Sequence, residues 1–442
     1  MRALAVLSVA VLGLGLLPGA GFAADRWPTP PPAPPGFVRP PRPTIPPKSV
    51  TSYTFYGRGW GHGVGMSQYG ARGRALAGQT SATILAHYYP KTTLGQADPS
   101  TIVRVLVLSG FAASTAKPLT ITGRLGTWTI DGVAGTFAAD ARVTLVPTSS
   151  AGTSWTLRVL SAANAQLAAR TITAGAVMVR PAASSTYLEL TTKGATYDLY
   201  RGSLNAILRS TASVVNHVPV DLYLRGVVPL EMPAGWPSEA LKVQAIAARS
   251  YALYRVHTSG SYDLYDDTRS QVYRGRRGEA TATNTAIAAT SGTVVLSGGK
   301  PANTLFHSSD GGWTENNENV FVSSTGAIVA GAVSYLRGSS DRAPDGSSYD
   351  QTSPYATWKT ATYSIAALSA VFAKDSRTAV GTIASLDLSR TGVSGRLISV
   401  TLRGSGGTKT VSGAVFVSAF NAGRSALDPQ MRGTLFATAP IP

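Results

Sequence analysis

The chain has 442 residues, of which 39 are basic and 22 acidic, so its net charge is +17, and it contains no cysteine. The length allows two or three domains, and the lack of cysteine excludes disulfides, thiol catalysis and cysteine-ligated zinc. The positive charge favours an anionic partner such as nucleic acid, a cell-wall polymer or an anionic envelope surface, although a charge that only serves solubility is an open alternative.

The first 50 residues have the pattern of an export signal followed by a spacer. An apolar run from Ala3 to Leu17 follows Arg2 and leads into small residues. This predicts a secretory signal peptide over residues 1–24, because the run is shorter than the ~20 residues that a membrane span needs; an uncleaved anchor is the alternative. We expect a secreted, cell-wall-associated protein with no stable membrane span after signal cleavage. Residues 25–50 are rich in proline and predict an extended, semi-rigid linker.

Residues 51–95 contain a glycine-rich string, YGRGWGHGVGMSQYGARG, which runs from Tyr56 to Gly73. So many glycines imply close backbone approaches and positive φ angles, and His62, Gln68 and Tyr69 stand among them as hydrogen-bonding side chains. Such a segment is either a sugar-contacting surface or a tight structural turn. A nucleotide-binding loop is excluded, because the phosphate-loop Lys-Ser/Thr pair and the strand-then-GxGxxG context are missing.

Residues 96–192 alternate apolar and polar residues in short runs such as IVRVLVL, RVTLVP and WTLRVL, separated by Gly, Asp, Asn and Pro. This pattern predicts a β-rich module, either a sandwich or a small barrel, and it contains no reactive constellation. Residues 193–442 continue with strands, short helices and one long helix. We therefore expect an α+β fold: a β-rich main domain over residues 51–95 and 193–442, with one long buried helix and an inserted small all-β module.

The stretch VVPLEMPAGWPSEALKVQAIAARSYALYR, from Val227 to Arg255, places Glu231 between Pro229 and Pro233. Because proline restricts its own φ and the residue before it, we expect Glu231 on a stiff, irregular loop. An Ala-rich helix from about Pro237 to Val256 should follow and be largely buried, since apolar residues cover most of its circumference. Burial would favour the protonated carboxyl that general-acid use requires, whereas the helix dipole favours the carboxylate. A solvated loop residue is the alternative.

Further polar candidates lie in this helix and beyond it. Lys242 and Arg249 are seven residues apart and should share the polar stripe of the helix. Gln271 lies in a polar stretch after the helix. A second polar cluster precedes two glycines at a predicted strand end and consists of His307, Ser308, Ser309 and Asp310.

Several of these strings together resemble the stage II sporulation protein D family, also described as amidase enhancers. The strings are YLRGVVPLEMPAGWPSEALKVQAIAARSYAL (Tyr223 to Leu253), GRGWGHGVGMSQYGA (Gly57 to Ala71), FHSSDGGWTENNENVF (Phe306 to Phe321) and QVYRG (Gln271 to Gly275). The resemblance implies binding and cleavage of peptidoglycan glycan strands, with members acting as lytic transglycosylases on strands stripped of stem peptides. It places the catalytic glutamate of the family at Glu231.

Two features depart from the sporulation-type members. In those members the GHGVGMSQYGA string follows the glutamate string, whereas here it precedes it, which resembles a circularly permuted arrangement that rebuilds the same site. Those members also carry a Cys/His zinc cluster beside the QVY string. This chain has Arg269-Ser270 there and no cysteine, so we expect no metal and no other cofactor.

The resemblance leads to a specific chemical expectation. A lytic transglycosylase can use one carboxyl group, so Glu231 should act first as acid and then as base, giving 1,6-anhydro-muramic ends without a second essential carboxylate. The nearest rivals for a second carboxylate are Glu239, Asp310 and Glu315. Lys242 and Arg249 are candidates for the lactyl carboxylate of a stripped strand, with structural or solvated roles as alternatives. The full set of substrate-binding candidates is His62, Gln68, Tyr69, Lys242, Arg249, Gln271, His307, Ser308 and Ser309.

Two other classes of function stay open at this point. A non-catalytic wall-binding protein that stimulates an N-acetylmuramoyl-L-alanine amidase would use the same surface and charge without needing Glu231, and a cell-wall amidase would then be its partner. An exported nucleic-acid binder would rest on charge alone. No aromatic and basic stacking platform is visible in the sequence, so we expect no nucleic-acid partner.

Overall fold

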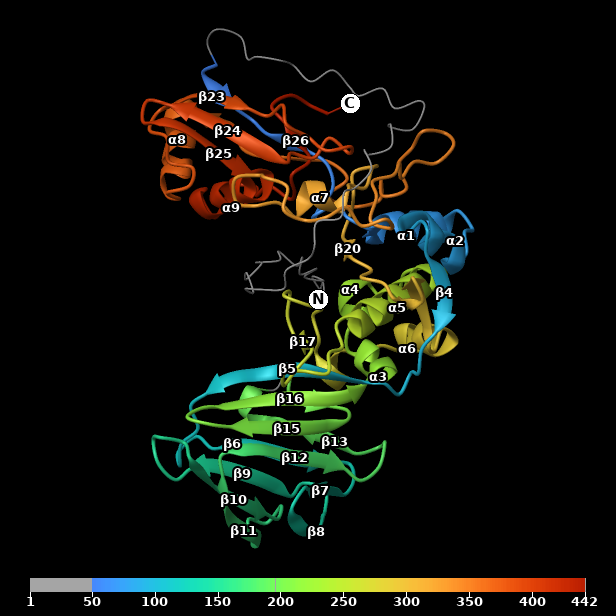
Figure 1. The fold of residues 1–442 in the computed structure, drawn as a ribbon, viewed down its shortest axis with the longest axis vertical. Coiled ribbons are helices and arrows are strands. Elements are labelled where there is room, and N and C mark those ends of the chain that lie inside the picture. The colour runs from blue at the N-terminus through green and yellow to red at the C-terminus, as the bar shows by residue number, and fades with distance from the viewer. Residues whose placement is uncertain (1–49, 195, 442) are drawn as a thin grey trace. The chain divides into compact units, whose positions relative to one another are not determined.

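A computed structural model describes residues 50–194 and 196–441, so the expected signal peptide and nearly all of the expected linker lie outside the described residues. The described chain forms two compact units. Unit 1 comprises residues 80–82 and 92–304 without residue 195, and unit 2 comprises residues 50–79, 83–91 and 305–441. The fold is α+β and rich in strands, as the sequence predicted (Figure 1). The segment boundaries at residues 95 and 192 remain predictions.

Unit 1 contains two large sheets. The first has seven strands in the order β17 (Leu264–Tyr265), β5 (Ile102–Phe111), β16 (Ala212–Pro219), β15 (Ser203–Leu208), β12 (Gly175–Pro181), β7 (Trp128–Ile130) and β8 (Val133–Phe137). The second has six in the order β11 (Gln166–Thr173), β10 (Ser154–Leu160), β9 (Arg142–Pro147), β6 (Leu119–Arg124), β13 (Tyr187–Glu189) and β14 (Leu199–Tyr200). Neighbouring strands are antiparallel except β17 and β5, which are parallel.

The two sheets pack against each other as a sandwich. A Cβ atom on Gly123 in β6 would lie 2.0 Å from the Trp128 indole of β7, so only glycine allows the sheets to approach this closely. Trp155 of β10 is fully buried, and its indole N–H donates to the Arg209 carbonyl at 3.2 Å. The sheets do not end at residue 192, because β14 to β17 continue them.

The long helix of unit 1 is α5, which spans Ser238–Tyr254 and is buried along most of its length. Its many alanines let helices α3 (Val220–Arg225) and α6 (Thr281–Ala289) approach closely, and β18 (Thr293–Ser297) packs beside it. Ser250 of α5 accepts a hydrogen bond from the Val295 N–H at 2.8 Å, which joins the helix to the sheet of β19 (Lys300–Pro301), β18 and β4 (Thr93–Gln96). The helix begins one residue later than expected, because Pro237 is its N-cap.

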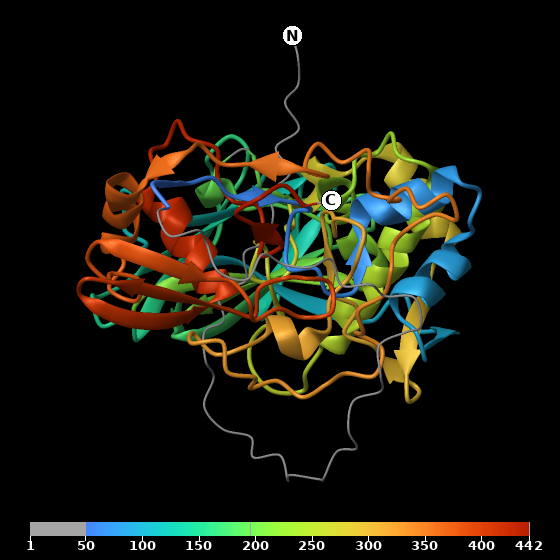
Figure 2. The ribbon, with the colours of Figure 1, turned by 90° about the horizontal axis from the view of Figure 1, so that it is seen from above.

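Unit 2 is built around an aromatic core to which both ends of the described chain contribute. The Phe55 ring lies 5.5 Å from the Phe436 ring and 5.8 Å from those of Phe416 and Phe420. The N-terminal strands β1 (Ser52–Tyr53) and β2 (Tyr56–Gly57) pair with C-terminal strands, so blue and red segments lie together in Figure 2. Their partners are β22 (Tyr363–Ser364) for β1, and β21 (Trp358–Lys359) and β26 (Phe436–Ala437) for β2.

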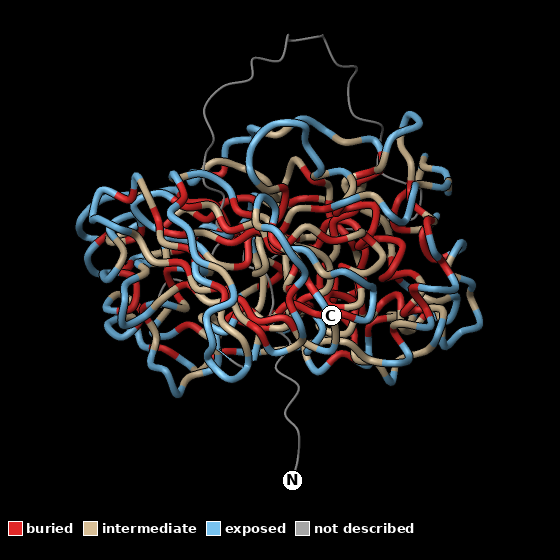
Figure 3. The backbone as a smooth tube through the Cα atoms, turned by 90° about the horizontal axis from the view of Figure 1, so that it is seen from below, coloured by how far each residue is buried: buried red, intermediate tan, exposed pale blue. Residues whose placement is uncertain are grey.

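The remaining elements of unit 2 surround this core. They are β3 (Met66–Ser67), α1 (Gln68–Leu76), β20 (Phe306–His307), α7 (Asn317–Val320), α8 (Ile365–Ala373), β23 (Ile383–Asp387), β24 (Ser399–Gly404), β25 (Gly407–Ser412) and α9 (Gly413–Gly423). Helix α2 (Ser81–Tyr88) has its first turn in unit 1 and the rest in unit 2. Buried residues form the red stretches of the tube in Figure 3. Among the described helices, none combines the length and the apolar character that crossing a bilayer would require.

Candidate functional site

Glu231 is the last residue of a one-turn helix, α4, which spans Val228–Glu231. The expected irregular loop is therefore wrong at this position. Pro229 occupies the first turn, where its missing N–H has no cost, and Pro233 disfavours helical geometry for Met232, which is extended with φ −126°. Buried Val228 and Met232 anchor the two sides of the turn, and the half-buried Glu231 is thus held on a fixed backbone.

Two buried tyrosines, Tyr223 from α3 and Tyr251 from α5, lie within range of the charge of the Glu231 carboxyl group. Burial raises the pKa of both hydroxyls, and the charge of Glu231 raises them further. The Tyr223 hydroxyl donates to Oε1 of Gln271 at 3.1 Å. Gln271 is almost fully buried, and its role as a substrate-binding residue stays a prediction.

Arg249 does not lie on a polar stripe with Lys242, contrary to expectation. Its side chain is 0% exposed and is used inside unit 1. It donates to Asp221 at 2.6 Å and to the carbonyl of Thr293 at 3.0 Å, and so ties α5 to α3 and β18. The face of α5 that carries Arg249 is covered by neighbouring elements. The hydrogen bonds to Asp221 and Thr293 offset the free-energy cost of burying the guanidinium charge. Lys242 is partly exposed and pairs with Glu239 at 2.7 Å.

The other carboxylates considered for a catalytic role are engaged in hydrogen bonds or ion pairs with neighbouring residues. Glu239 also accepts the Ser81 N–H at 2.6 Å, at the start of α2. Glu315 accepts five hydrogen bonds, from Ser394 Oγ, Asn319 Nδ2 and three backbone N–H groups. The other carboxylates of residues 208–296 are in ion pairs, namely Asp221 with Arg249, Asp263 with Arg104, Asp266 with Lys193, Asp267 with Arg269 and Glu279 with Arg201.

In unit 2 the glycine-rich segment lies along residues 305–310. Positive φ angles occur at Gly59, Gly61, Gly63 and Gly65, a backbone conformation that glycine adopts far more readily than other residues. Trp60, His62 and Val64 lie between these glycines. At Gly65 a Cβ atom would lie 2.2 Å from the Leu305 carbonyl oxygen. Strands β3 and β20 pair in parallel, and a backbone bridge joins Trp60 to Ser309.

This packing brings most of the candidates of unit 2 together. The rings of His62 and His307 are 5.3 Å apart, and both histidines bond to Val64: His62 Nδ1 accepts its N–H at 3.0 Å, and His307 Nδ1 donates to its carbonyl at 3.2 Å. Burial lowers the pKa of His62 to about 4 and that of His307 well below its usual value. Both imidazoles are therefore neutral at pH 7.

The serines of this cluster differ in their roles. Ser309 accepts from the Trp60 N–H at 3.0 Å and from the Ser353 hydroxyl at 3.2 Å, so it serves the fold. In the described part of the chain, Oγ of Ser308 and Nε2 of His307 are buried without a hydrogen-bond partner. Gln68 and Tyr69 begin α1, and the Tyr69 N–H donates to the Ser308 carbonyl at 2.9 Å.

Comparison with known proteins finds relatives for part of the chain. Residues 208–296 match the profile described as Stage II sporulation protein. The chain is 35% identical over 145 residues to an amidase enhancer of Bacillus subtilis, a match that covers 31% of this chain and 20% of the relative. It is 33% identical over 151 residues to stage II sporulation protein D of Bacillus amyloliquefaciens, covering 30% of this chain and 44% of the relative.

Residues 208–296 are therefore similar to the stage II sporulation protein D family. A further relative is stage II sporulation protein D of Bacillus subtilis, to which the chain is 31% identical over a segment that covers 39% of that protein. The chain therefore matches less than half the length of each of these three relatives. The family profile contains Glu231, Lys242, Arg249 and Gln271 of this chain. The candidates from residues 62–69 and 307–309 lie outside it.

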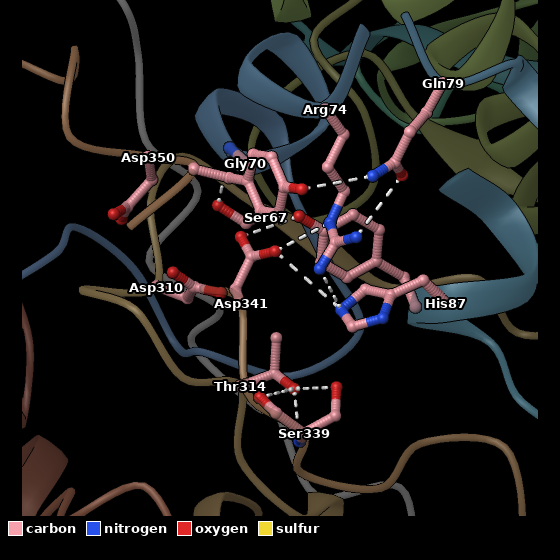
Figure 4. A network of polar contacts seen from close by, with 12 residues as sticks. Ser67, Gly70, Arg74, Gln79, His87, Asp310, Thr314, Ser339, Asp341 and Asp350 are labelled. Carbon is pink, nitrogen blue, oxygen red and sulfur yellow. Dashed lines mark hydrogen bonds and ion pairs between the residues drawn. The ribbon is translucent and has the colours of Figure 1, made fainter. Parts of the chain in front are cut away.

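One polar network of unit 2 was missed from the sequence. Asp341 accepts from Arg74 Nε and from the Tyr88 hydroxyl, each at 2.8 Å, and Asp310 and Asp350 lie beside it (Figure 4). Burial and the neighbouring carboxylates raise the pKa of Asp310 well above its usual value. Arg74 and Asp341 are 267 residues apart in sequence, so no local pattern could have predicted the pair.

The neutral His62 predicts a pH dependence of stability. Unfolding restores an ordinary histidine pKa, so below about pH 6.5 the unfolded state binds a proton that the folded state takes up only near pH 4. Stability should fall as the pH drops from 6.5 to 4, by about 2 kcal/mol at pH 5 from His62 alone. In the His62→Asn variant the amide oxygen can still accept a hydrogen bond from the Val64 N–H. The decrease in its free energy of unfolding on acidification should be smaller than that of the wild type by about this amount, as measured by urea unfolding followed by tryptophan fluorescence.

The matched control for this prediction is Gln351→Asn. Gln351 is exposed in the same unit and carries no titratable group, so replacing it should leave the pH dependence unchanged. If His62→Asn kept the full wild-type slope between pH 7 and pH 5, His62 would have to be protonated in the folded state.

Proposed function

We propose that this protein is a secreted, cell-wall-associated lytic transglycosylase that cleaves peptidoglycan glycan strands free of stem peptides. The observation that carries the proposal is the position of Glu231 within the matched family domain, at the end of α4 and within electrostatic range of two buried tyrosine hydroxyls. The names of the relatives, stage II sporulation protein D and amidase enhancer, support a role at the cell wall.

The reaction needs one group that gives and then takes back a proton. The Glu231 carboxyl protonates the glycosidic oxygen as the bond from C1 to that oxygen breaks. The resulting carboxylate then accepts the proton of the 6-hydroxyl of the muramic acid, whose oxygen bonds to C1. The products are a new free hydroxyl end and a 1,6-anhydro end, and no water is consumed.

The local structure suits this use of a single carboxyl. Glycosidases that form a covalent intermediate or activate water need a second carboxylate within about 10 Å. Here the attacking hydroxyl belongs to the substrate, so its effective concentration is already high. The other carboxylates of the domain are engaged in ion pairs, and the rigid turn of α4 keeps Glu231 in one place.

Substrate contacts are proposed for each unit by itself. In unit 1 the partly exposed Lys242 and the buried Gln271 are retained as candidates, whereas buried Arg249 is assigned to positioning. In unit 2 His62, Gln68, Tyr69, His307 and Ser308 are proposed to hydrogen-bond sugar hydroxyls and acetamides. With Nδ1 of the neutral His307 ring donating to the Val64 carbonyl, its Nε2 atom can accept a hydrogen bond from a sugar hydroxyl.

The similarity to an amidase enhancer favours a second candidate function, non-catalytic binding of the wall that stimulates an N-acetylmuramoyl-L-alanine amidase. The two candidates differ in their products. Purified protein incubated with stem-free glycan strands should generate 1,6-anhydro-muramic ends that mass spectrometry detects. Strands that stay intact, together with faster stem release when an amidase is added, would favour the enhancer function instead.

A further inference from the structure

Three half-buried side chains from distant parts of the sequence meet in unit 2. Trp60 lies in the glycine-rich segment, Tyr355 precedes β21, and Arg432 precedes β26. The Trp60 and Tyr355 rings are 4.3 Å apart and nearly perpendicular. The Arg432 guanidinium lies 4.7 Å from the centre of the Trp60 ring and 4.4 Å from that of Tyr355. We call these three residues the aromatic–arginine platform.

Backbone hydrogen bonds fix the three members of the platform. The Gly61 N–H donates to the Arg432 carbonyl at 3.1 Å, and the Gly59 N–H donates to the Tyr355 carbonyl at 2.9 Å. Trp60, between these glycines, also donates its own N–H to the Ser309 carbonyl at 2.8 Å. The platform is therefore preorganised, and a ligand would not have to order it.

Arg432 is half-buried, and none of the ion pairs within residues 50–194 and 196–441 joins it to a carboxylate. Partial burial lowers its pKa, and the charged neighbour that lowers it further is another cation, Arg424. The guanidinium keeps its charge and its fork of N–H donors. A partly desolvated cation without an anion favours a ligand that brings one.

We propose that Trp60, Tyr355 and Arg432 form a binding subsite for a sugar that carries a carboxylate, in which the guanidinium pairs with the carboxylate and one of the two perpendicular rings stacks on the apolar face of the sugar. Two aromatic rings beside one fork of donors match a pyranose with an acidic substituent, because the ring stacks while the acid is held by two parallel hydrogen bonds. A neutral sugar would leave the guanidinium unpaired.

This subsite deepens the proposed glycan function and rests on it for the identity of the polymer. The muramic acid of a glycan strand bears a lactyl group that ends in a free carboxylate only when the stem peptide has been removed, since the stem is attached there through an uncharged amide. The platform therefore selects stem-free strands by charge.

The test is a binding experiment with two matched ligands. The full-length secreted chain carrying Glu231→Gln, which prevents cleavage during the measurement, is titrated with stem-free strands and with the same strands after their carboxylates have been converted to methylamides. Arg432→Gln should weaken binding of the charged strands by about tenfold or more and leave binding of the amidated strands unchanged. Arg432→Lys should keep part of the preference, because it retains the charge without the fork.

The control is Arg390→Gln, which removes an equal charge from an exposed position of the same unit and should change neither affinity. Thermal unfolding of each variant verifies the fold. Equal loss for both ligands in Arg432→Gln, or an unchanged preference for the charged strands, overturns the subsite. The binding experiment does not measure cleavage. If binding is charge-selective but the wild-type protein yields no anhydro product in the cleavage assay, only the proposed catalysis is contradicted.

Two competitors separate the sources of the carboxylate. If a polyuronic acid displaces the strands and this competition is lost in Arg432→Gln, the platform accepts any acidic pyranose. If the polyuronic acid does not compete, the subsite is restricted to the lactyl group. A single-stranded oligonucleotide also offers stackable rings and anionic charge. If the oligonucleotide binds more tightly than the glycan and its binding depends on Arg432 to the same degree, the assignment to a sugar is overturned.

Discussion

Replacing Glu231 with glutamine should reduce the release of 1,6-anhydro-muramic ends by a factor of about 10²–10⁴, because an amide can neither give nor accept the transferred proton. The substitution keeps the size and polarity of the side chain. The short helix α4 and its buried anchors Val228 and Met232 should therefore be unaffected, and the far-ultraviolet circular dichroism and the thermal midpoint should match those of the wild type. Product release is followed by mass spectrometry of digested strands.

The matched control is Glu239→Gln, eight residues farther along the chain. Glu239 pairs with Lys242 and accepts the Ser81 N–H, so its loss should cost some stability but leave cleavage intact. Cleavage that survives in Glu231→Gln and fails in Glu239→Gln would reverse the assignment. If neither protein nor the wild type cleaves strands, while all three stimulate an amidase equally, the enhancer function explains the domain.

The sequence was sufficient to predict the parts of the fold that depend on local patterns. Alternation in residues 96–192 predicted paired strands, and the alanine-rich run after Pro237 predicted the buried helix α5 to within two residues at its C-terminus. The fold class followed from these patterns together. Glu231 was singled out by the two prolines around it, although the same prolines suggested an irregular loop where the chain forms a turn of helix.

Features that depend on distant contacts were not predictable in this way. Arg249 looked like a polar-stripe residue because helical spacing places it with Lys242, but whether that face is covered depends on where α3 and β18 pack. The aromatic–arginine platform was missed for the same reason, since its three residues lie in three separate parts of the sequence and no string contains two of them. The sequence supplied residues of suitable chemistry, and tertiary packing decided which of them meet.

The Asp341 network gives the largest expected effect on stability. Asp341 is fully buried, and its carboxylate satisfies Arg74, which is 8% exposed, and the Tyr88 hydroxyl. Asp341→Ala removes the acceptor of both groups and leaves the Arg74 charge without its partner in unit 2. Losing one member of a buried ion pair costs about 3–5 kcal/mol, so the free energy of unfolding of unit 2 should fall by roughly that amount.

A matched exposed pair tests whether burial is the cause. Asp375 pairs with Arg377 at 2.6 Å, but that arginine is 50% exposed, so Asp375→Ala should cost at most about 1 kcal/mol. Both variants are compared by urea unfolding, with hydrogen exchange of peptides from residues 305–441 to follow unit 2. A double variant, Asp341→Ala with Arg74→Met, should recover part of the lost stability, because it removes the unpaired charge as well. Equal losses in Asp341→Ala and Asp375→Ala would mean that water reaches Arg74 and replaces the missing carboxylate.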